Sequence, residues 1–543
     1  MGSMNLPVSI LLAALSGGLL AIGWPAIGGF EPALFIGFVP LLFLEESYHQ
    51  KQQKLSFGYP FLAFALFNIL TTWWIFCVTE SMATKILVLT AAVFVNSTMM
   101  SIVFSLFQYV KRMLGSKHGY FGLIVLWLGF EYFHLYWELT WPWLTLGNGF
   151  ANQVSWVQWY EFTGVFGGSL WILLANVLVF TILKNALAGM EFRRNLKWIL
   201  ALTIVLLAPI VISMSIYSSY VEKGTPMEVL IVQPNIDPYL EKYDVPYEEQ
   251  VNRLLSLVKE KISPQTNFVV APETAFTEDI LENLPENSLT IKMILEFLKG
   301  YPKTEIISGM SSYHLFEPGE DLSSTARAIP NSGQYYDAFN AAIQLNAEGK
   351  VQIYHKSKLV QGVEKMPFAT ILKPLENLAL DLGGTTGSLG SQEESSVFAS
   401  EHTTINTAPV ICYESIYGEY VASYVSKGAN LIFVITNDGW WDDTPGYKQH
   451  MAYSRLRAIE TRRSIARAAN TGISCFINQR GDTLQTTGWW EAVAIKGVLN
   501  ANDKITVFTM AGNYIGRIAS FLALTLIIYS FVRSKKDASF VKA

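Results

Sequence analysis

Three reactive side chains follow three strand-like runs in the second half of the chain. Glu273 ends TNFVVAPE, Lys356 ends KVQIYHK, and Cys412 lies in APVICYES, where a strand gives way to a helix expected to begin near Ile416. A thiol can act as a nucleophile, a carboxylate as a general base and an ammonium group as a stabiliser of negative charge. Each residue alone has a plainer interpretation, because charged strand ends are usually solvated and a Cys after Val-Ile usually lies in a core.

The segment that must position these residues, from about 226 to 505, alternates strands and helices. Further strand-like runs are MEVLIVQPN, EIISGMSSY, AFNAAIQLN, NLIFVITND and ISCFINQRGD. Helices are expected at 247–262, 289–301 and 450–470, the last with an apolar face among arginines. Loops are expected at 331–337 and 383–394. The segment is long enough for an α/β or α+β domain with its own core.

The rest of the chain is too apolar for an ordinary soluble protein. Of 543 residues, 51% are hydrophobic and 15% are charged, whereas soluble domains carry about 25% charged residues. This composition excludes a disordered chain, three cysteines exclude a disulfide scaffold, and a net charge of −5 gives no indication of nucleic-acid binding. A membrane span needs roughly 20 apolar residues. Eight stretches fit: 8–23, 27–44, 57–78, 86–110, 119–137, 165–184, 196–217 and 514–532.

The basic residues of the short loops predict the orientation of these spans. Most Lys and Arg follow spans two, four, six and eight, whereas the opposite short loops carry only Lys85. Both termini are therefore expected in the cytoplasm and the large segment outside it. A cleaved signal peptide is the alternative for the first span, but no basic region precedes it. Residues 1–3 are interpreted as an expression scar.

The loop at 137–160 is rich in aromatic residues and contains no Lys or Arg. It carries Trp137, Trp141, Trp143, Trp156, Trp159 and Tyr160. One interpretation is an aromatic belt at headgroup depth. The other is a surface that admits lipid to a site above the membrane.

Cofactor motifs are absent from the sequence. The histidines are scattered, without CxxC or HExxH spacing, and there is no GxxxxGK[ST] or strand-linked GxGxxG. We therefore expect neither a metal ion nor an organic cofactor.

Taken together, the order and spacing of Glu273, Lys356 and Cys412 resemble the Glu-Lys-Cys triad of the nitrilase superfamily. With its spans, the whole chain is similar to the apolipoprotein N-acyltransferase family. VLIVQPNI, WPWLTLGN with GVFGGSLW, TNDGWW and RAIETRRSIARAANTGIS match motifs of that family. The resemblance implies an α-helical membrane bundle of eight spans plus an α/β nitrilase-like αββα sandwich inserted between spans seven and eight. The expected domains are 4–217, 226–505 and 514–532.

The resemblance also assigns roles to the triad. Cys412 would be the nucleophile that forms a thioester, and Glu273 would be the general base. Lys356 would stabilise the thiolate and the oxyanion, together with the backbone N–H of Tyr413. A neighbouring cation lowers the pKa of a thiol, so a lowered pKa is expected for Cys412.

Further site residues follow from the same resemblance. Glu364 would orient the ammonium group of Lys356 or share its proton, and Tyr413 and Glu414 match the residues directly after the family's nucleophile. Packing is the plainer interpretation of Tyr413. Tyr243 lies where the family often has a Trp on a lid. The sequence has Gln361-Gly362-Val363 where the family usually has Pro-Phe-Gly, and Lys358 is a less well placed alternative to Lys356.

The implied reaction is ping-pong transfer of an acyl chain from a phospholipid, with phosphatidylethanolamine the expected donor, to the α-amine of a diacylglyceryl-cysteine on an apolipoprotein. The resemblance implies a monomer in the bacterial inner membrane, its catalytic domain periplasmic, with no nucleic-acid partner.

A membrane-tethered amidase is one alternative, but a tether needs only one span. A transporter is the other, but its usual internal repeats and mid-membrane charges are not evident.

Overall fold

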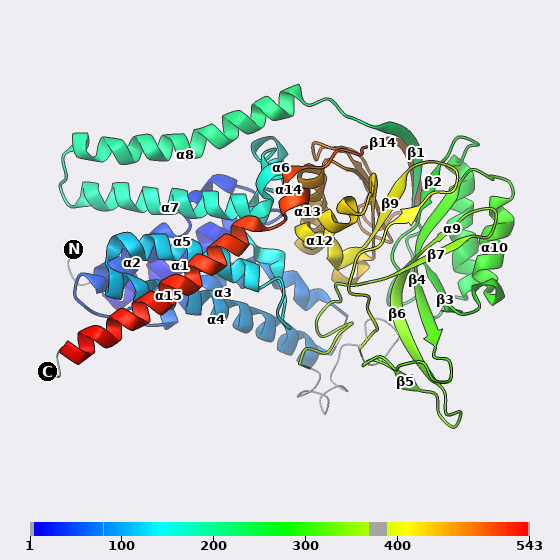
Figure 1. The fold of residues 1–543 in the computed structure, drawn as a ribbon, viewed down its shortest axis with the longest axis horizontal. Helices are drawn as coiled ribbons and strands as arrows, with labels where there is room; N and C mark the ends of the chain where they lie inside the picture. The colour runs from blue at the N-terminus through cyan, green and yellow to red at the C-terminus, as the bar shows by residue number, and fades with distance from the viewer. Residues whose placement is uncertain (1–4, 80, 369–387, 541–543) are drawn as a thin grey trace. The chain divides into compact units, whose positions relative to one another are not determined.

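The structure is a computed structural model that describes residues 5–79, 81–368 and 388–540. The predicted expression scar and residues 383–387 of a predicted loop lie outside these residues. The chain divides into two compact units, 1–219 with 511–543 and 220–510 (Figure 1). Each unit is described by itself.

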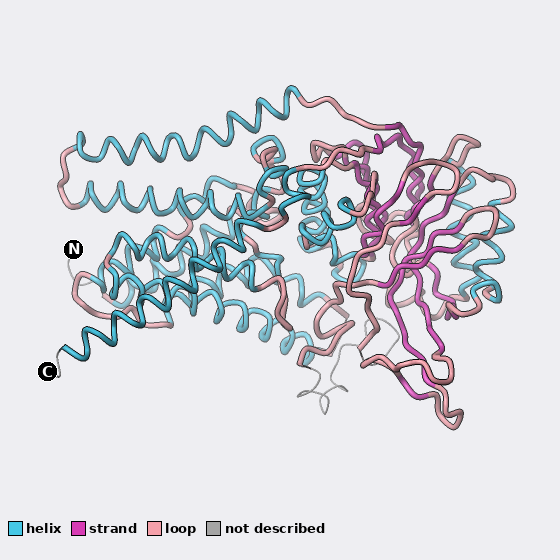
Figure 2. The backbone as a smooth tube through the Cα atoms, viewed as in Figure 1, coloured by secondary structure: helices cyan, strands magenta, loops and turns pink. Residues whose placement is uncertain are grey.

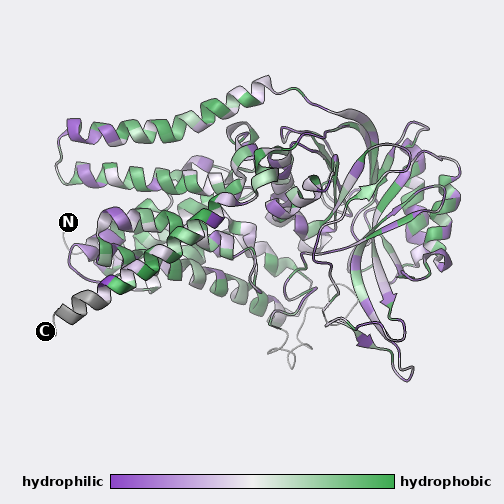
Figure 3. Cartoon of the chain, viewed as in Figure 1, coloured by the Kyte–Doolittle hydropathy of each residue, from purple (hydrophilic) through white to green (hydrophobic). Residues whose placement is uncertain are grey.

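The first unit is helical. Its α-helices are α1 (Leu6–Ile22), α2 (Val39–His49), α3 (Gly58–Thr72), α4 (Met82–Leu114), α5 (Ser116–Phe133), α6 (Tyr160–Thr163), α7 (Val165–Leu187), α8 (Phe192–Ser219) and α15 (Tyr514–Phe540). Its short 3₁₀ helices are η1 (Glu31–Ile36), η2 (Trp73–Cys77), η3 (Pro142–Leu144), η4 (Leu146–Phe150) and η5 (Val154–Trp156). Apolar residues dominate the long helices, as Figure 3 shows.

Five helical segments of the described chain are long and apolar enough to cross a membrane. They are Gly58–Cys77, Met82–Leu114, Val165–Leu187, Phe192–Ser219 and Tyr514–Ser534, and α1 is a shorter apolar helix. The stretch 27–44 does not form one continuous helix, because it divides into η1 and then α2. Each of these two helices has a proline in its first turn, where proline favours a helix start rather than a helix interior.

Two side chains of the aromatic loop and one predicted loop lysine are buried within the first unit. Trp143 is 1% exposed and Tyr160 is fully buried, so a headgroup belt or lipid-admitting surface does not describe these two side chains. The Tyr160 hydroxyl donates to the Gly147 carbonyl at 2.8 Å. Lys111 lies in the last turn of α4 and is buried against the carboxylates of Glu45 and Glu46.

The second unit is an αββα sandwich of two sheets. One sheet has the order β14-β1-β2-β4-β6-β5, with β3 on β4 and β7 on β6, and the other has the order β13-β12-β11-β10-β9-β8. The first sheet comprises β1 (Thr225–Gln233), β2 (Phe268–Val270), β3 (Phe276–Leu281), β4 (Glu305–Leu315), β5 (Arg327–Ala328), β6 (Tyr335–Leu345), β7 (Val351–His355) and β14 (Val493–Ala501). The second comprises β8 (Phe398–Ala399), β9 (Asn406–Ile411), β10 (Leu431–Thr436), β11 (Ser464–Ala469), β12 (Cys475–Ile477) and β13 (Thr483–Thr486). Figure 2 shows these strands in magenta.

Helices cover the outer faces of both sheets. Helices α9 (Tyr247–Lys261) and α10 (Leu289–Leu298) lie on the first sheet, and α12 (Gly418–Ser426) and α13 (Pro445–Thr461) on the second. Shorter helices are η6 (Pro285–Asn287), η8 (Cys412–Ile416), η9 (Asp438–Trp441) and α14 (Val507–Ala511). Every residue of β10 is buried, as expected for a parallel strand covered on both faces. The predicted α/β sandwich is thus confirmed for this unit.

The helix predicted over 450–470 is half wrong. Helix α13 ends at Thr461, Arg462 adopts the left-handed conformation with φ of 51°, and β11 follows and pairs in parallel with β10. The arginines are not on a solvated face, since Arg457, Arg463 and Arg467 are almost fully buried. Their guanidinium groups donate to buried carbonyl oxygens and carboxylates, which no periodicity of apolar residues signals.

Gly309 on β4 lets this strand approach the backbone that carries Glu273. A Cβ at Gly309 would lie 2.4 Å from the Thr274 nitrogen and 2.5 Å from the Glu273 Cα. We predict that Gly309→Ala lowers the free energy of unfolding by about 2 kcal/mol, because overpacking forces the backbone to shift. Thermal unfolding in detergent measures this loss. Gly300→Ala is the control, since its Cβ would make only an ordinary 3.5 Å contact, and an equal loss in both variants would contradict the prediction.

Candidate active site

The three reactive residues of the sequence lie where strands of both sheets end. Glu273 follows β2, Lys356 directly follows β7, and Cys412 directly follows β9. Strands β2 and β4 are parallel, and β7 shares their direction because both β4 and β7 are antiparallel to β6. Cys412 has a φ of 47°, a strained conformation that L-residues adopt mainly at functional sites.

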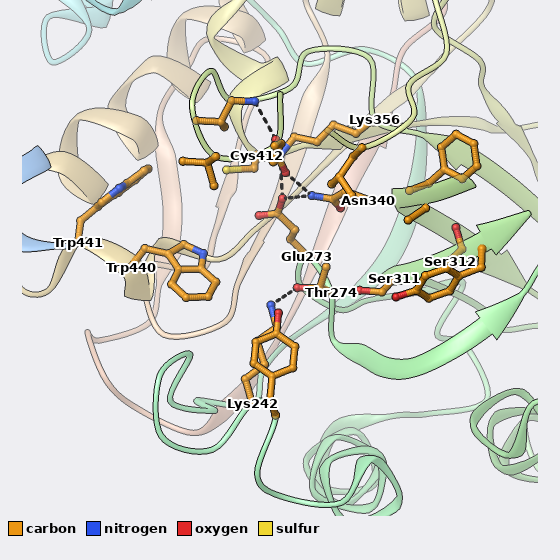
Figure 4. A pocket seen from close by; sticks show the side chains of 18 residues that line it. Lys242, Glu273, Thr274, Ser311, Ser312, Asn340, Lys356, Cys412, Trp440 and Trp441 are labelled. Atoms are coloured by element: carbon orange, nitrogen blue, oxygen red, sulfur yellow. Dashed lines mark hydrogen bonds and ion pairs between the residues drawn. The ribbon is translucent and has the colours of Figure 1, made fainter. Parts of the chain in front are cut away.

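All three side chains line one cavity (Figure 4). Glu364 and Tyr243 also line it, whereas Tyr413, Glu414 and Lys358 do not. The remaining wall residues are Lys242, Thr274, Ser311, Ser312, Tyr313, Ala338, Phe339, Asn340, Val360, Val363, Leu389, Trp440 and Trp441. The site is therefore a largely buried pocket with charged groups at its base and aromatic rings on its walls.

A shared set of hydrogen bonds holds the charged groups. Lys356 Nζ donates to Glu273 Oε1 and to Glu364 Oε1, both at 2.9 Å. Asn340 Nδ2 donates to the same two oxygens at 2.8 and 2.7 Å. The backbone N–H of Asn437, just after β10, donates to Glu273 Oε2 at 3.1 Å. Both sheets thus fix the carboxylate of Glu273.

Burial and ion pairing set the charges of this pocket. Burial opposes the charge of Glu273, but Lys356, helped by Asn340, holds the pKa of this carboxyl below its ordinary value. Burial likewise opposes the Lys356 ammonium, but Glu273 and Glu364 raise its pKa well above the ordinary value. At neutral pH, Glu273 is therefore a carboxylate and Lys356 an ammonium group.

The thiol of Cys412 differs from the sequence-based expectation. Burial raises its pKa well above the ordinary value, and the nearby Glu273 carboxylate adds to this, against the lowering by Lys356. The expectation of a lowered pKa is wrong, because it considered the cation without burial or the carboxylate. The resting side chain is a neutral thiol, so an attack by its sulfur would require a base to take the proton.

Glu364 is positioned by a turn that follows Lys356. The Glu364 Oε2 accepts from the Val360 N–H at 2.8 Å, and Gly362, with φ of 78°, closes the turn by donating to the Lys365 carbonyl at 2.8 Å. The Gln361-Gly362-Val363 replacement therefore still forms a turn. This turn places the Glu364 carboxylate beside that of Glu273, where both accept hydrogen bonds from Lys356 Nζ and Asn340 Nδ2.

Glu414 lies behind the cavity and connects the two strands that carry Lys356 and Cys412. Its Oε1 accepts from the Tyr354 hydroxyl at 2.5 Å and the Ser357 N–H at 2.7 Å, and its Oε2 accepts from the Ile411 N–H at 2.9 Å. Burial raises the pKa of this fully buried carboxyl. Its geometry is that of a positioning residue.

The other predicted residues take different places. Tyr413 is buried against Tyr417, which fits the packing interpretation. Tyr243 is 53% exposed at the cavity wall. Lys358 Nζ lies 5.0 Å from the ring centre of Tyr420, and the structure thus brings Lys356 to the carboxylates and Lys358 to an aromatic surface.

A buried polar network behind the nucleophile was not anticipated from the sequence. The Cys412 carbonyl accepts from the Ser415 hydroxyl at 2.7 Å and from His450 Nε2 at 3.1 Å. His450 Nδ1 lies 3.0 Å from Asp438 Oδ1, and Arg467 donates to Asp438 Oδ2 at 2.5 Å. This network stabilises the strained backbone of Cys412. Among the described residues, no group of His, Cys, Asp and Glu could hold a metal ion.

Comparison with known proteins identifies the family. The model of the apolipoprotein N-acyltransferase N-terminal domain matches residues 16–178, and that of carbon-nitrogen hydrolase matches residues 229–499. An apolipoprotein N-acyltransferase of Chlorobaculum tepidum is 30% identical over 534 residues, which cover 96% of this chain and 97% of the relative. This chain belongs to the apolipoprotein N-acyltransferase family.

Another relative agrees with this membership, and one solved structure resembles part of the chain. The family's Geobacter metallireducens member is 26% identical over 511 residues, covering 93% of this chain and 91% of its own. The solved structure of Saccharomyces cerevisiae Nit3, of the nitrilase superfamily, covers 52% of this chain and 92% of its own, with 14% identity and a TM-score of 0.37. The predicted resemblance is confirmed: the chain is an acyltransferase with a carbon-nitrogen hydrolase domain.

Asn340 is a site residue that the sequence interpretation missed. Replacing it by Leu removes a hydrogen bond that lowers the pKa of Glu273. Activity that needs the carboxylate is lost as the pH falls through this pKa, so we predict that Asn340→Leu moves the acid limb of the pH–rate profile to higher pH. The profile of kcat/KM for acylation of Cys412 measures this shift. Gln352→Leu, on neighbouring β7, is the control, and an unmoved acid limb in Asn340→Leu would refute the assignment.

Replacement of the Glu414 carboxylate by an amide is predicted to destabilise the protein. Both of its oxygens accept hydrogen bonds, each from at least one backbone N–H group. A Gln side chain would therefore place its NH₂ group against one of these N–H donors in either orientation. We predict that Glu414→Gln lowers the free energy of unfolding by about 2 kcal/mol and slows acylation of Cys412. Chemical unfolding and acylation rates measure these effects. Glu394→Gln, at a highly exposed ion pair with Lys427, should be nearly neutral, and equal effects would argue against a positioning role.

Proposed function

We propose that this enzyme transfers a fatty acyl chain from a phospholipid, with phosphatidylethanolamine as donor, to the α-amino group of an N-terminal diacylglyceryl-cysteine on apolipoproteins. One observation carries the proposal: Cys412, Glu273 and Lys356 line a single cavity in a chain that is related along almost its whole length to apolipoprotein N-acyltransferases. The names of these relatives supply the acceptor, and the Glu-Lys-Cys constellation supplies the chemistry.

The first half-reaction loads the enzyme. The Cys412 sulfur attacks an ester carbonyl of the phospholipid while its proton passes to the carboxylate of Glu273. Lys356, with the backbone N–H of Tyr413, stabilises the oxyanion of the tetrahedral intermediate. The ester C–O bond then breaks, the leaving alkoxide takes the proton from Glu273, and a lysophospholipid departs. A thioester remains on Cys412, and Glu273 is again a carboxylate.

The second half-reaction unloads the acyl chain. The α-amine of the acceptor attacks the thioester carbonyl, and Glu273 takes a proton from the nitrogen. The C–S bond breaks as an amide forms, and Glu273 returns the proton to the sulfur. The neutral resting thiol supports this cycle, because both half-reactions require one base that exchanges a single proton with Cys412.

Glu364 acts with Lys356 in this proposal. Its carboxylate accepts a 2.9 Å hydrogen bond from the Lys356 ammonium group. This second partner keeps the ammonium group in position when Glu273 is protonated and loses its negative charge. The Lys356 ammonium therefore stays in place through the whole cycle. Tyr413, buried against Tyr417, orients the turn that presents its N–H.

The membrane arrangement belongs to the same proposal. Eight spans in 4–217 and 514–532 would hold a catalytic domain of 226–505 on the periplasmic face of the bacterial inner membrane, in a monomeric enzyme. Both proposed substrates are lipid-anchored, so the nucleophile must be within reach of the headgroups. Tyr243, exposed at the cavity wall, is proposed to lie on the lid over the site. Transfer needs no metal ion or organic cofactor in this scheme.

The proposal predicts a covalent intermediate on one residue. Incubation with phosphatidylethanolamine labelled in its acyl chain should label the wild-type enzyme and leave Cys412→Ala unlabelled, since no other residue is the nucleophile. Cys475→Ala is the matched control, because this thiol is also buried but lies outside the cavity. Label retained on Cys412→Ala would exclude Cys412 as the acylated residue.

The proposal also predicts which lysine matters. Lys356→Ala should reduce acylation about a hundredfold or more, since a lost oxyanion donor costs this much, whereas Lys358→Ala should act nearly as the wild type. Rates of label incorporation compare the two variants. The opposite order would show that the oxyanion is stabilised by Lys358.

The function itself is tested on its product. A lipoprotein with a diacylglyceryl-cysteine N-terminus, incubated with enzyme and phospholipid, should gain the mass of one acyl chain on its α-amine. Release of free fatty acid without this gain would indicate a hydrolase.

A further inference from the structure

A second lysine, Lys242, enters the catalytic cavity and has no role in the reaction described above. It is 6% exposed and follows β1 on the loop before α9. Its ammonium group donates to the Thr274 hydroxyl, next to Glu273 along the chain. Figure 4 shows Lys242 on the side of the cavity away from Lys356.

The contacts of Lys242 leave its charge without a counter-ion. Within the described residues, Lys242 Nζ has no carboxylate at ion-pair distance, and Thr274 is its one hydrogen-bond partner. The indole of Trp440 lies 5.2 Å from Nζ and the ring of Tyr243 lies 5.6 Å from it. Aromatic faces attract a cation but do not replace an anionic partner.

The other cation of the cavity is already paired. Lys356 binds the carboxylates of Glu273 and Glu364 directly. Burial lowers the pKa of Lys242 to about 8, although the charges of Glu273 and Glu364 oppose this lowering. An ammonium group held in this way, with two N–H donors unused, is stabilised strongly by an anion that arrives with a substrate.

The chemistry of the proposed donor identifies that anion. In a phospholipid the phosphodiester is attached to the same glycerol as the two acyl esters, only a few bonds from the carbonyl carbon that Cys412 attacks. The acceptor's diacylglyceryl group carries no such charge. A bound donor therefore brings a negatively charged phosphodiester into a cavity whose spare cation is Lys242, whatever charge the rest of the headgroup carries.

We propose that Lys242 binds the phosphodiester of the acyl donor and so selects a phospholipid over an uncharged ester. This inference rests on the proposed function. It assigns Lys242 to substrate binding, with Trp440 and Tyr243 holding the ammonium group in the cavity and Thr274 orienting it. The proton chemistry stays with Glu273.

Two acyl donors, one with a phosphodiester and one without, distinguish phosphate binding by Lys242 from an effect on the reactivity of Cys412. Acylation of Cys412 is measured with phosphatidylethanolamine in mixed micelles and with p-nitrophenyl butyrate, an uncharged ester without phosphate. Lys242→Met should lower kcat/KM for the phospholipid about tenfold or more, as expected for a lost charged hydrogen bond, mainly through a higher KM. Its reaction with p-nitrophenyl butyrate should stay close to the wild-type rate. Lys242→Arg should recover most of the loss.

Two other outcomes would contradict phosphate binding by Lys242. An equal loss with both donors would show that Lys242 acts on Glu273 or on folding rather than on phosphate, and an unchanged phospholipid rate would exclude any role in donor binding. Lys242→Gln, which keeps a polar head, repeats the comparison if Lys242→Met does not fold. Lys299→Met, at an exposed ion pair, is the control lysine.

Two further arms define what occupies the site. If millimolar inorganic phosphate inhibits p-nitrophenyl butyrate turnover in the wild type but not in Lys242→Met, and Lys242→Met also keeps its kcat/KM for the phospholipid, the site binds free phosphate and a lipid headgroup is excluded as its ligand. No acylation of the wild type by any phospholipid would instead refute the proposed function, whatever the Lys242 variants do. The two failures are therefore distinguishable.

Discussion

The ion pair of one buried ammonium group with two carboxylates is the constraint on which the catalytic unit depends. Lys356 is 1% exposed, and a buried charge is tolerated only where partners compensate its lost hydration. Glu273 and Glu364 provide that compensation, and Asn340 donates to both of them. Because these groups come from different strands and a turn, the sandwich must close accurately before the site can exist.

The same constraint explains why the nucleophile rests as a thiol. A thiolate beside the Glu273 carboxylate would add a third negative charge to a buried site in which Lys356 already faces two carboxylates. In the proposed cycle, the proton leaves the sulfur only when an ester arrives, and the negative charge then forms on an oxyanion that Lys356 stabilises. The Glu414 carboxylate and the network of His450 and Asp438 hold the turn on which this geometry rests.

The sequence predicted the features that short-range pattern controls. Alternating apolar runs predicted the strands of the sandwich, and the resemblance to the Glu-Lys-Cys triad of the nitrilase superfamily predicted that Glu273, Lys356 and Cys412 would lie together. It missed what three-dimensional packing decides: the break of α13 at Arg462, the split of 27–44 into two short helices, and the role of Asn340, whose only sequence signal is a polar residue in an apolar strand. The predicted lowering of the Cys412 pKa was wrong because it took account of the nearby cation but not of burial or of the Glu273 carboxylate.

The most direct measurement of the proposed mechanism is a single-turnover chase followed by mass spectrometry. Enzyme mixed with phosphatidylethanolamine alone should show one acyl chain on the peptide that contains Cys412, and hydroxylamine should remove it, as expected for a thioester. Addition of a diacylglyceryl-cysteine peptide should then move that acyl chain to the α-amine at a rate no slower than turnover. An acyl chain on another residue, or transfer without any enzyme-bound acyl group, would contradict the Cys412 thioester.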